Sequence, residues 1–415
     1  MKARAGLGRA SRVAAVLACL WAGAPLATLA QAPEFPFGVY DKATVEPASA
    51  EGREYYAKLF ALLRSNHINT VLAQPYKSAT TTLDLLEQAR RAGIHVIMSV
   101  GNPLNPAWDY AGPGHPFDRA YRHPSVIAYK YGDEPKDLAT LQRLVSVYGA
   151  IDHFYSLPIV TAVAGENSDF SSSDVAVELW NTLHSKVRFA RFYPLRRVDD
   201  LASFNAAKMR MPFDAWASRM ESFSDVPWWY IAQTFGKGME KNAASYWRFP
   251  TSAELSALTH IALANGARAI IGYALQDHSG YQGLVDEQLN PRRARDGSIP
   301  LEQYRHLGAL TAANAALLSR HQRASFDVVA SNEALLAVPR YDPQSGTRYL
   351  YLVNKNTESA LATTVILQGV ANLRGVLDQY TGAAQNGVTV TGGALQFRVS
   401  LAPGDAQFWA LQVAG

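Results

Sequence analysis

Two adjacent carboxylates, Asp133 and Glu134, are the residues whose type and position most strongly indicate chemistry. They follow an apolar and aromatic run, residues 126–132, and they precede Pro135. Such a run predicts a β-strand, and proline ends it because proline has no N–H to donate to a sheet. A carboxylic acid at the C-terminal end of a strand stands where α/β barrels keep catalytic groups. A turn that caps a following helix is the alternative interpretation.

Strict alternation along this strand predicts which way each carboxylate faces. The bulky face, which should pack under helices, carries Ile127, Tyr129 and Tyr131. The other face carries Ala128, Lys130, Gly132 and Glu134. We therefore expect Glu134 to point into the space that the sheet encloses, and Asp133 to turn away from it. Lys130 is either a member of an interior ion pair or, in a different class of enzyme, a Schiff-base lysine of aldolase type.

Other predicted strand ends supply further polar and aromatic side chains. Asp277 is a third candidate catalytic carboxylate. The candidate substrate-binding residues are Asp41, Gln74, Asn102, Trp108, Glu166, Tyr193, Trp229, Gln233 and Tyr273. Carboxylates, amides and aromatic rings together suit a polyhydroxylated ligand with an apolar face, which describes a carbohydrate. Cleavage of a glycosidic bond needs a proton donor and usually a second carboxylate. Many of the aromatic rings would serve equally well in packing between strands and helices.

The elements that must position these residues are alternating strands and helices. Strands are predicted at residues 35–41, 68–73, 95–100, 126–135, 157–163, 187–193, 226–234 and 268–274. Eight strand–helix units over residues 33–322 predict an α/β fold, a (β/α)8 TIM barrel, with an open doubly wound sheet as the rival. The helix after the seventh strand has a capping-box signal, Thr251 followed by Glu254. The chain has neither a Gly-x-Gly-x-x-Gly after its first strand nor a P-loop, so nucleotide binding has no support.

The pattern changes near residue 323. Residues 395–401 alternate between apolar and polar side chains, and similar short runs surround them with no helix between. We therefore predict a C-terminal all-β sandwich at residues 323–415. Nothing in it forms an aromatic row that core packing would not explain, so we expect it to pack on the barrel rather than bind sugar.

The first 32 residues have the features of a secretory signal peptide. Of the formal net charge of +4, four positive charges come from Lys2, Arg4, Arg9 and Arg12, which precede an apolar run that ends in small residues. This predicts a periplasmic or secreted bacterial protein, with no membrane span because the run is short. Cys19 also fits a lipoprotein box, so a lipid anchor there is the alternative. The remaining chain is near neutrality, which implies no nucleic-acid partner.

The end of the fourth strand, Gly132-Asp133-Glu134-Pro135, resembles the Asn-Glu-Pro ending found in a large clan of barrel glycoside hydrolases, which includes β-galactosidases and cellulases. Residues 228–235, 248–254 and 264–273 also resemble uncharacterised bacterial barrels of glycosidase type. The resemblance covers roughly residues 35–320 of the chain. It implies a glycoside hydrolase with a carbohydrate substrate, in which Glu134 is the acid/base and Asp133 orients the substrate.

The sequence departs from that clan at the seventh strand, where Gln233 stands in place of the nucleophilic glutamate. An amide cannot form the glycosyl-enzyme ester. An adjacent Asp-Glu pair resembles the β-N-acetylhexosaminidase-like barrels, in which the acetamido group of a 2-acetamido sugar attacks. An inverting enzyme would instead draw its base from Asp277, Glu166 or Asp41. A barrel that binds glycan without cleaving it is the remaining interpretation.

No metal and no cofactor are predicted. His115, His123 and His278 are loop histidines that do not cluster in the sequence. We therefore expect carbohydrate as the ligand of this protein and no resident prosthetic group.

Overall fold

The structure of the protein is a computed structural model. It describes residues 33–73, 78–100, 114–134, 144–145, 148–149, 151–165, 175–195, 212–223, 226–237, 247–370, 372–385, 389–391 and 394–413. Residues 33–415 form one compact unit. The predicted signal peptide at residues 1–32, with Cys19, lies outside the described residues and stays a prediction.

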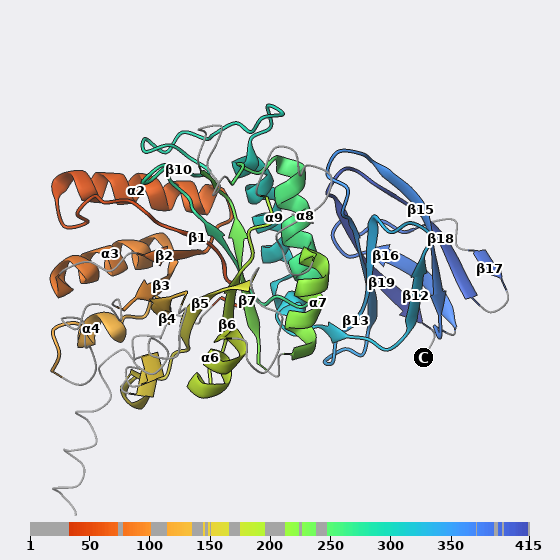
Figure 1. Cartoon of the computed structure of the whole chain (residues 1–415), viewed down its shortest axis with the longest axis horizontal. Helices are drawn as coiled ribbons and strands as arrows, with labels where there is room; N and C mark the ends of the chain where they lie inside the picture. The colour runs from red at the N-terminus through yellow and green to blue at the C-terminus, as the bar shows by residue number, and fades with distance from the viewer. Residues whose placement is uncertain are drawn as a thin grey trace, which may run out of the picture. The chain divides into compact units, whose positions relative to one another are not determined.

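Eight parallel strands close into a barrel (Figure 1). They are β1 (Phe37–Tyr40), β2 (Thr70–Ala73), β3 (His95–Ser99), β4 (Val126–Asp133), β5 (Ile159–Ala164), β6 (Arg188–Arg191), β7 (Trp228–Gln233) and β9 (Ile270–Tyr273). Each strand pairs with the next in the chain, and β9 closes the barrel by pairing with β1. The predicted barrel and its eight strands are confirmed.

Helices pack outside the strands. They are α2 (Ala50–Ser65), α3 (Ala79–Ala92), α4 (Asp118–Tyr121), α6 (Val175–Leu183), α7 (Phe213–Phe223), α8 (Ser252–Ala264), α9 (Pro300–Ala313) and α10 (Ala315–Leu318). The predicted capping box is confirmed at α8, where the Thr251 side chain accepts from the Glu254 N–H at 3.2 Å and the Glu254 carboxylate accepts from the Thr251 N–H at 2.9 Å. None of the described helices has both the length and the apolar character needed to cross a membrane.

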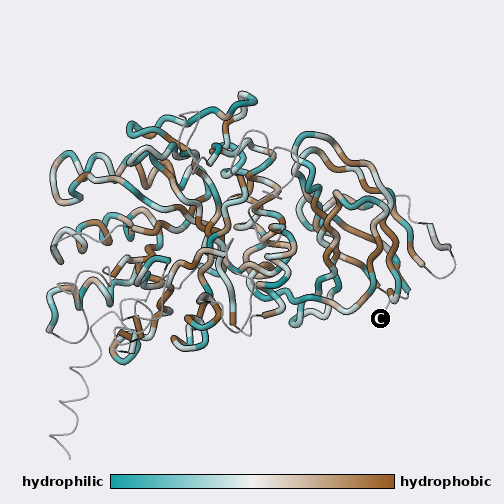
Figure 2. The backbone as a smooth tube through the Cα atoms, viewed as in Figure 1, coloured by the Kyte–Doolittle hydropathy of each residue, from teal (hydrophilic) through white to brown (hydrophobic). Residues whose placement is uncertain are grey.

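Two layers of apolar side chains hold the barrel together. The outer layer lies between strands and helices and includes Tyr129, Tyr131 and Tyr230. The inner layer fills the barrel itself and includes Phe189 and Trp229. Figure 2 shows the hydrophobic residues concentrated along the strands. A packed interior leaves the C-terminal rim, which we call the mouth, as the place where side chains meet solvent.

Beyond the barrel, nine strands form two antiparallel sheets. One sheet has the order β11-β13-β14-β19-β16 and the other β12-β15-β18-β17. Their bounds are β11 (Gln322–Arg323), β12 (Asp327–Ala330), β13 (Leu335–Tyr341), β14 (Arg348–Asn354), β15 (Leu361–Gln368), β16 (Leu373–Asp378), β17 (Thr389–Thr391), β18 (Ala394–Leu401) and β19 (Ala406–Val413). Residues of both sheets, among them Leu350, Val365 and Trp409, share one apolar cluster. The all-β character of this region is confirmed.

Candidate active site

Strand β4 carries two β-bulges that change which way its residues face. Against β3, Val96 pairs with Val126 and Ile97 with Ala128, so one extra residue lies between the two pairs. Against β5, the pairing passes from Lys130 directly to Asp133 while β5 advances by only two residues. Each bulge reverses the alternation of side chains beyond it. Strict alternation was therefore the wrong assumption for this strand.

Gly132 is the residue that makes the second bulge possible. Its φ of 75° lies in the left-handed region, where glycine has no steric cost. A Cβ built on Gly132 would lie 2.7 Å from the Cδ2 atom of Leu144, which places this residue on the helix side together with Tyr131. Gly132 was expected to face inward, and the structure corrects that expectation.

Asp133 faces inward as a result, which corrects the expectation that it turns away. Its Oδ1 atom lies 3.2 Å from Nζ of Lys130, a residue of the inward face, and 70% of the Asp133 side chain is exposed. Lys130 is thus a member of an ion pair at the mouth, one of the two roles predicted for it. Ile127 was expected on the face that packs under the helices. It packs in the inner layer instead, which corrects that expectation.

Glu134 reaches across β5 toward β6. Its carboxylate binds the Arg191 guanidinium at two points, with Nη2 2.9 Å from Oε2 and Nε bonded to Oε1. Its backbone N–H donates to the Ala162 carbonyl at 2.9 Å, and its φ of 44° is left-handed. A non-glycine residue in that conformation costs about 1–3 kcal/mol, and such residues cluster at functional sites. A bidentate guanidinium–carboxylate pair is a strong interaction with a well-defined geometry.

Aromatic rings surround this pair of carboxylates. The Arg191 guanidinium lies 4.8 Å from the centroid of the Tyr193 ring, and Tyr193 stacks on Tyr273 at 6.2 Å. Tyr273 also meets Tyr40 edge to face at 5.1 Å. Burial raises the pKa of all three tyrosines, so each is a neutral phenol that can donate a hydrogen bond.

Lys42 completes this surface from the loop after β1. Its ammonium lies 4.9 Å from the centroid of the Tyr273 ring and 5.5 Å from that of Tyr40. Burial, followed by the positive charge of Lys130, lowers the pKa of Lys42 to about 8. We use the name mouth floor for the set Tyr40, Lys42, Lys130, Asp133, Glu134, Arg191, Tyr193 and Tyr273.

Four members of the mouth floor were not predicted from the sequence as site residues. Tyr40, Lys42 and Arg191 were not singled out, and Lys130 was named only for its two alternative roles. Arg191 falls within the predicted sixth strand on the face of Phe189, so alternation would have pointed it inward. Lys42 and Tyr40 flank Asp41, and neither has a sequence signal that marks it as a site residue.

Asp41 is buried at the end of β1, where it contacts α2. It is 1% exposed, and its Oδ1 atom accepts from Gln276 at 2.9 Å and from the Ala43 N–H at 3.0 Å. Its Oδ2 atom accepts from the Tyr56 hydroxyl at 3.1 Å. Burial raises its pKa. With both oxygens bonded to the protein, Asp41 supports the loop that carries Lys42.

Gln233 is also fully buried, and its amide joins two loops. Its Oε1 atom accepts from the Leu195 N–H at 2.9 Å, while its Nε2 atom donates to the carbonyls of Leu195 at 3.0 Å and Arg248 at 3.1 Å. A glutamate here could not donate to those carbonyls. The amide at this position therefore has a structural explanation. Trp229, from the same strand, packs in the inner layer against Phe189 at 6.2 Å.

Asp277 lies in the loop after β9. One oxygen accepts from the Gly283 N–H at 2.8 Å and the other pairs with Arg292. Within the described part of the chain, these contacts tie it to its own loop rather than to Asp133 or Glu134. Four further candidates lie outside the described residues and stay predictions: Gln74, Asn102, Trp108 and Glu166.

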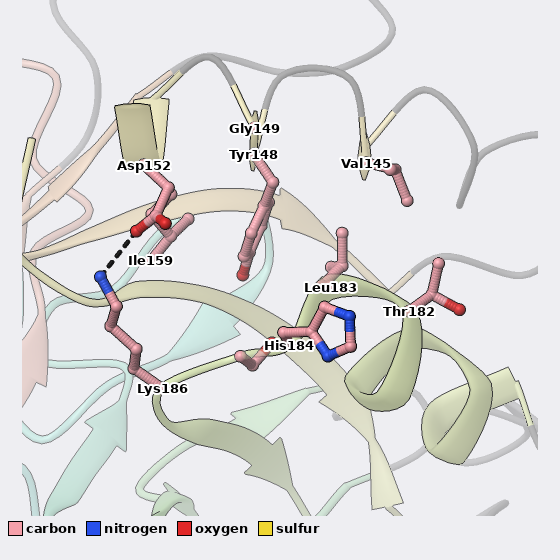
Figure 3. A pocket seen from close by; sticks show the side chains of 10 residues that line it. Val145, Tyr148, Gly149, Asp152, Ile159, Thr182, Leu183, His184 and Lys186 are labelled. Carbon is pink, nitrogen blue, oxygen red and sulfur yellow. Dashed lines mark hydrogen bonds and ion pairs between the residues drawn. The ribbon is translucent and has the colours of Figure 1, made fainter. Parts of the chain in front are cut away.

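Two further features of the described residues bear on the site. No group of three or more His, Cys, Asp or Glu side chains in this part of the chain could hold a metal ion. A cavity of about 240 Å³ is lined by Tyr148, Asp152 and Lys186 among others (Figure 3). It lies beside Ile159, where β5 begins, and therefore at the end of the barrel opposite the mouth. Its Lys186 pairs with Asp152 at 2.6 Å.

Comparisons with solved structures agree with the fold. A β-galactosidase from Bacillus circulans sp. alkalophilus matches with a TM-score of 0.59 at 9% sequence identity, over 92% of this chain and 99% of that chain. A β-galactosidase from G. stearothermophilus matches with a TM-score of 0.58 at 9% identity, over the same shares. A trehalulose synthase matches with a TM-score of 0.50 at 11% identity, over 92% and 100%.

No protein-family model and no curated protein matches the sequence. At identities near 10% the structural likeness shows the fold, and the activity must be argued from the site. The resemblance to the barrel glycoside hydrolases, inferred from residues 132–135, is confirmed at the level of the fold.

Proposed function

We propose that the protein is an exported glycoside hydrolase that cleaves an oligosaccharide or polysaccharide at the mouth of its barrel. The observation that carries this proposal is that two carboxylates stand at the C-terminal rim, Asp133 turned inward by the second bulge of β4 and Glu134 held by Arg191 with a left-handed backbone. Cleavage of a glycosidic bond uses a pair of carboxylates, and here the pair lies beside neutral phenols that form an aromatic surface.

Glu134 is the proposed acid/base. Its proton goes to the leaving oxygen as the glycosidic bond breaks, and it then removes a proton from the attacking water. Because Arg191 is bonded to both oxygens of the carboxylate, proton transfer to the substrate requires the substrate to replace part of that ion pair. This arrangement couples proton delivery to occupancy of the site.

Asp133 is the proposed substrate-orienting residue. Strict alternation would turn Asp133 away from the mouth, which would not fit this role. The bulge turns Asp133 inward, which does fit it. Asp41 and Asp277 are bonded to their own surroundings, which favours a route that relies on the adjacent pair. A 2-acetamido sugar whose own acetamido group attacks is the substrate this pair fits best. An inverting route with Glu166 as the base is the alternative.

A second candidate function is glycan binding without cleavage. It is favoured by the salt bridges that both carboxylates already make, to Lys130 and to Arg191. Turnover separates the two functions, because a binding barrel would release no reducing ends.

The Glu134→Gln variant tests the proposal. Turnover on a glycan that the wild-type protein cleaves should fall by about 10²–10⁴, the range for loss of a general acid. Glu302→Gln is the control, since Glu302 is an exposed glutamate on α9. Wild-type turnover in Glu134→Gln would reject the assignment, and binding of glycans with no turnover by the wild type would favour the second candidate.

Export and the role of the C-terminal sheets are part of the same proposal. We infer that residues 1–32 are removed on export to the periplasm or medium, so that mass spectrometry of native protein would find a chain beginning near Gln31 or Pro33. A chain beginning at lipidated Cys19 would indicate the anchored alternative. We also propose that the two antiparallel sheets form a sandwich, a separate domain from residue 323, that supports the barrel and does not itself bind sugar.

A further inference from the structure

Lys42 is the one ammonium of the mouth floor that makes no ion pair within the described residues, although the charges of Asp133 and Asp41 act on it from a greater distance. Asp133 pairs with Lys130 at 3.2 Å, and Glu134 is bound at both oxygens by Arg191. Within the described ranges, the contacts of Lys42 Nζ are with the rings of Tyr40 and Tyr273. Both carboxylates of the mouth floor are therefore paired with a cation other than Lys42.

The position of Lys42 is fixed by a buried network. Its backbone N–H donates to Gln276 Oε1 at 3.0 Å. The Nε2 atom of Gln276 donates to Asp41 at 2.9 Å and to the Tyr55 hydroxyl at 3.0 Å. Asp41 and Gln276 are 1% and 2% exposed. A lysine held by so buried a network differs from a solvated surface lysine, whose side chain and backbone move freely.

The electrostatic surroundings of Lys42 favour the binding of an anion. Burial and the neighbouring charge of Lys130 both disfavour its ammonium form, and they lower its pKa to about 8. An arriving anion would offset both effects. The charge of Asp133 acts in the opposite direction on Lys42, so the two side chains lie in the same part of the mouth.

We propose that Lys42 binds a carboxylate of the substrate, and that the substrate is therefore a glycan containing hexuronic acid. This inference rests on the proposed function, and it names the substrate class of that site. A uronic acid differs from the neutral hexose by a carboxylate in place of the C6 hydroxymethyl group. An ammonium bonded to that carboxylate makes a charge-assisted hydrogen bond, which a neutral sugar cannot match.

Matched methyl glycosides test the inference with the full chain. Methyl glucuronoside and methyl galacturonoside are compared with methyl glucoside and methyl galactoside by ligand-observed NMR, so that each pair differs only at C6. At least one uronoside should bind about tenfold or more tightly than its neutral partner. In Lys42→Met that preference should fall by about 10- to 100-fold, the range for losing a hydrogen bond to a charged group.

Two further variants separate charge from folding. Lys42→Arg keeps the charge and should keep most of the preference for the uronoside. Lys58→Met removes an exposed lysine of α2 and should leave the preference unchanged. Equal binding of uronoside and neutral glycoside by the wild type, or an unchanged preference in Lys42→Met, would overturn the assignment. Tighter binding of a 6-sulfated glycoside than of the uronoside would also overturn it, in favour of a sulfated sugar.

The outcomes also distinguish this inference from the function on which it rests. Turnover of neutral glycans with no preference for uronosides would overturn the role of Lys42 and leave the hydrolase proposal standing. A preference for uronosides that depends on Lys42, without turnover of any glycan, would support the inference and count against hydrolysis.

Discussion

The mouth floor and the interface between the barrel and the C-terminal sheets differ in how their charged groups are buried and paired. At the interface, Arg340 is fully buried; it pairs with Glu221 of α7 and donates to Nδ1 of His321 at 2.7 Å. His260 of α8 is likewise buried, and its Nδ1 atom lies 2.8 Å from the Tyr351 hydroxyl. At the mouth, Asp133 is largely exposed, and the Lys42 ammonium lies against two aromatic rings without an ion pair in the described chain.

The difference separates stabilising polar groups from those available to a ligand. Buried polar groups that the protein itself satisfies specify how two layers fit together, and removing one leaves its partner exposed to an apolar environment. Half-exposed groups with strained backbone and spare hydrogen-bonding capacity are maintained at a cost in stability. Changes at the interface should therefore alter stability with little effect on chemistry, whereas changes at the mouth should alter chemistry.

The largest expected effect on stability is that of Arg340→Met. It breaks a buried ion pair and leaves Nδ1 of His321 without its donor, which should lower the free energy of unfolding by about 3–5 kcal/mol. Urea denaturation measures this, and turnover of the protein that remains folded should be unchanged. Arg53→Met is the control, because its pair with Asp84 is 3.5 Å long and the Arg53 side chain is 61% exposed. A loss no larger than that of the control would contradict the contrast.

Gly132→Ala tests the mouth by removing the bulge that turns Asp133 inward. A left-handed φ costs alanine about 1–2 kcal/mol, and a Cβ 2.7 Å from Leu144 adds an overpacking cost of similar size. We expect a loss of about 2–4 kcal/mol in stability together with a loss of turnover. Gly93→Ala is the matched control, since Gly93 has a φ of 70° with open space where its Cβ would lie. It should lose only the backbone part and keep its activity.

These variants also mark where sequence reasoning reaches its limit. The barrel strands and the C-terminal strands were predictable because hydrophobic alternation and capping signals are local. A bulge depends on register with neighbouring strands, so the reversal at Asp133 was not predictable from alternation alone. Gly132 was nevertheless a usable signal, because glycine inside a strand often marks a bulge.

The site residues show the same limit. Glu134 was located by its strand end, but its partner Arg191 lies 57 residues away, and the residue that fixes Lys42 lies 234 residues away. Strand ends also pointed to Asp41 and Gln233. Only the structure shows that their polar atoms are bonded to the protein, because hydrogen-bond satisfaction is a property of the folded chain.

His260 predicts how the stability of the interface depends on pH below neutrality. Burial lowers its pKa to about 3, against about 6.5 in an unfolded chain. The unfolded state therefore binds a proton that the folded state does not, so stability is lost as the pH falls from about 6.5 toward 3. One proton contributes a slope of up to about 1.4 kcal/mol per pH unit. His260→Gln, which can still bond to Tyr351, should have a shallower pH dependence of unfolding. An unchanged slope would assign the effect to other groups such as His321, whose pKa burial also lowers.

The smallest expected effect is a loss of uronoside affinity at the mouth as the pH rises above neutrality. Lys42, with its pKa near 8, is charged at neutral pH and loses its proton as the pH rises through that value. Uronoside affinity should therefore fall by roughly tenfold between pH 7 and 10, the effect of losing one charge-assisted hydrogen bond.

The groups that face Lys42 are Lys130 and Asp133 of β4, Asp41 of its own loop, Tyr40, Tyr273 and His278. Burial raises the pKa of both tyrosines and lowers that of His278, so these three stay neutral across this range. In Lys42→Arg the guanidinium keeps its charge to far higher pH, and the alkaline loss of affinity should disappear. If the loss persists in Lys42→Arg, a group other than Lys42 causes it, and the assignment of the uronoside carboxylate to Lys42 is overturned.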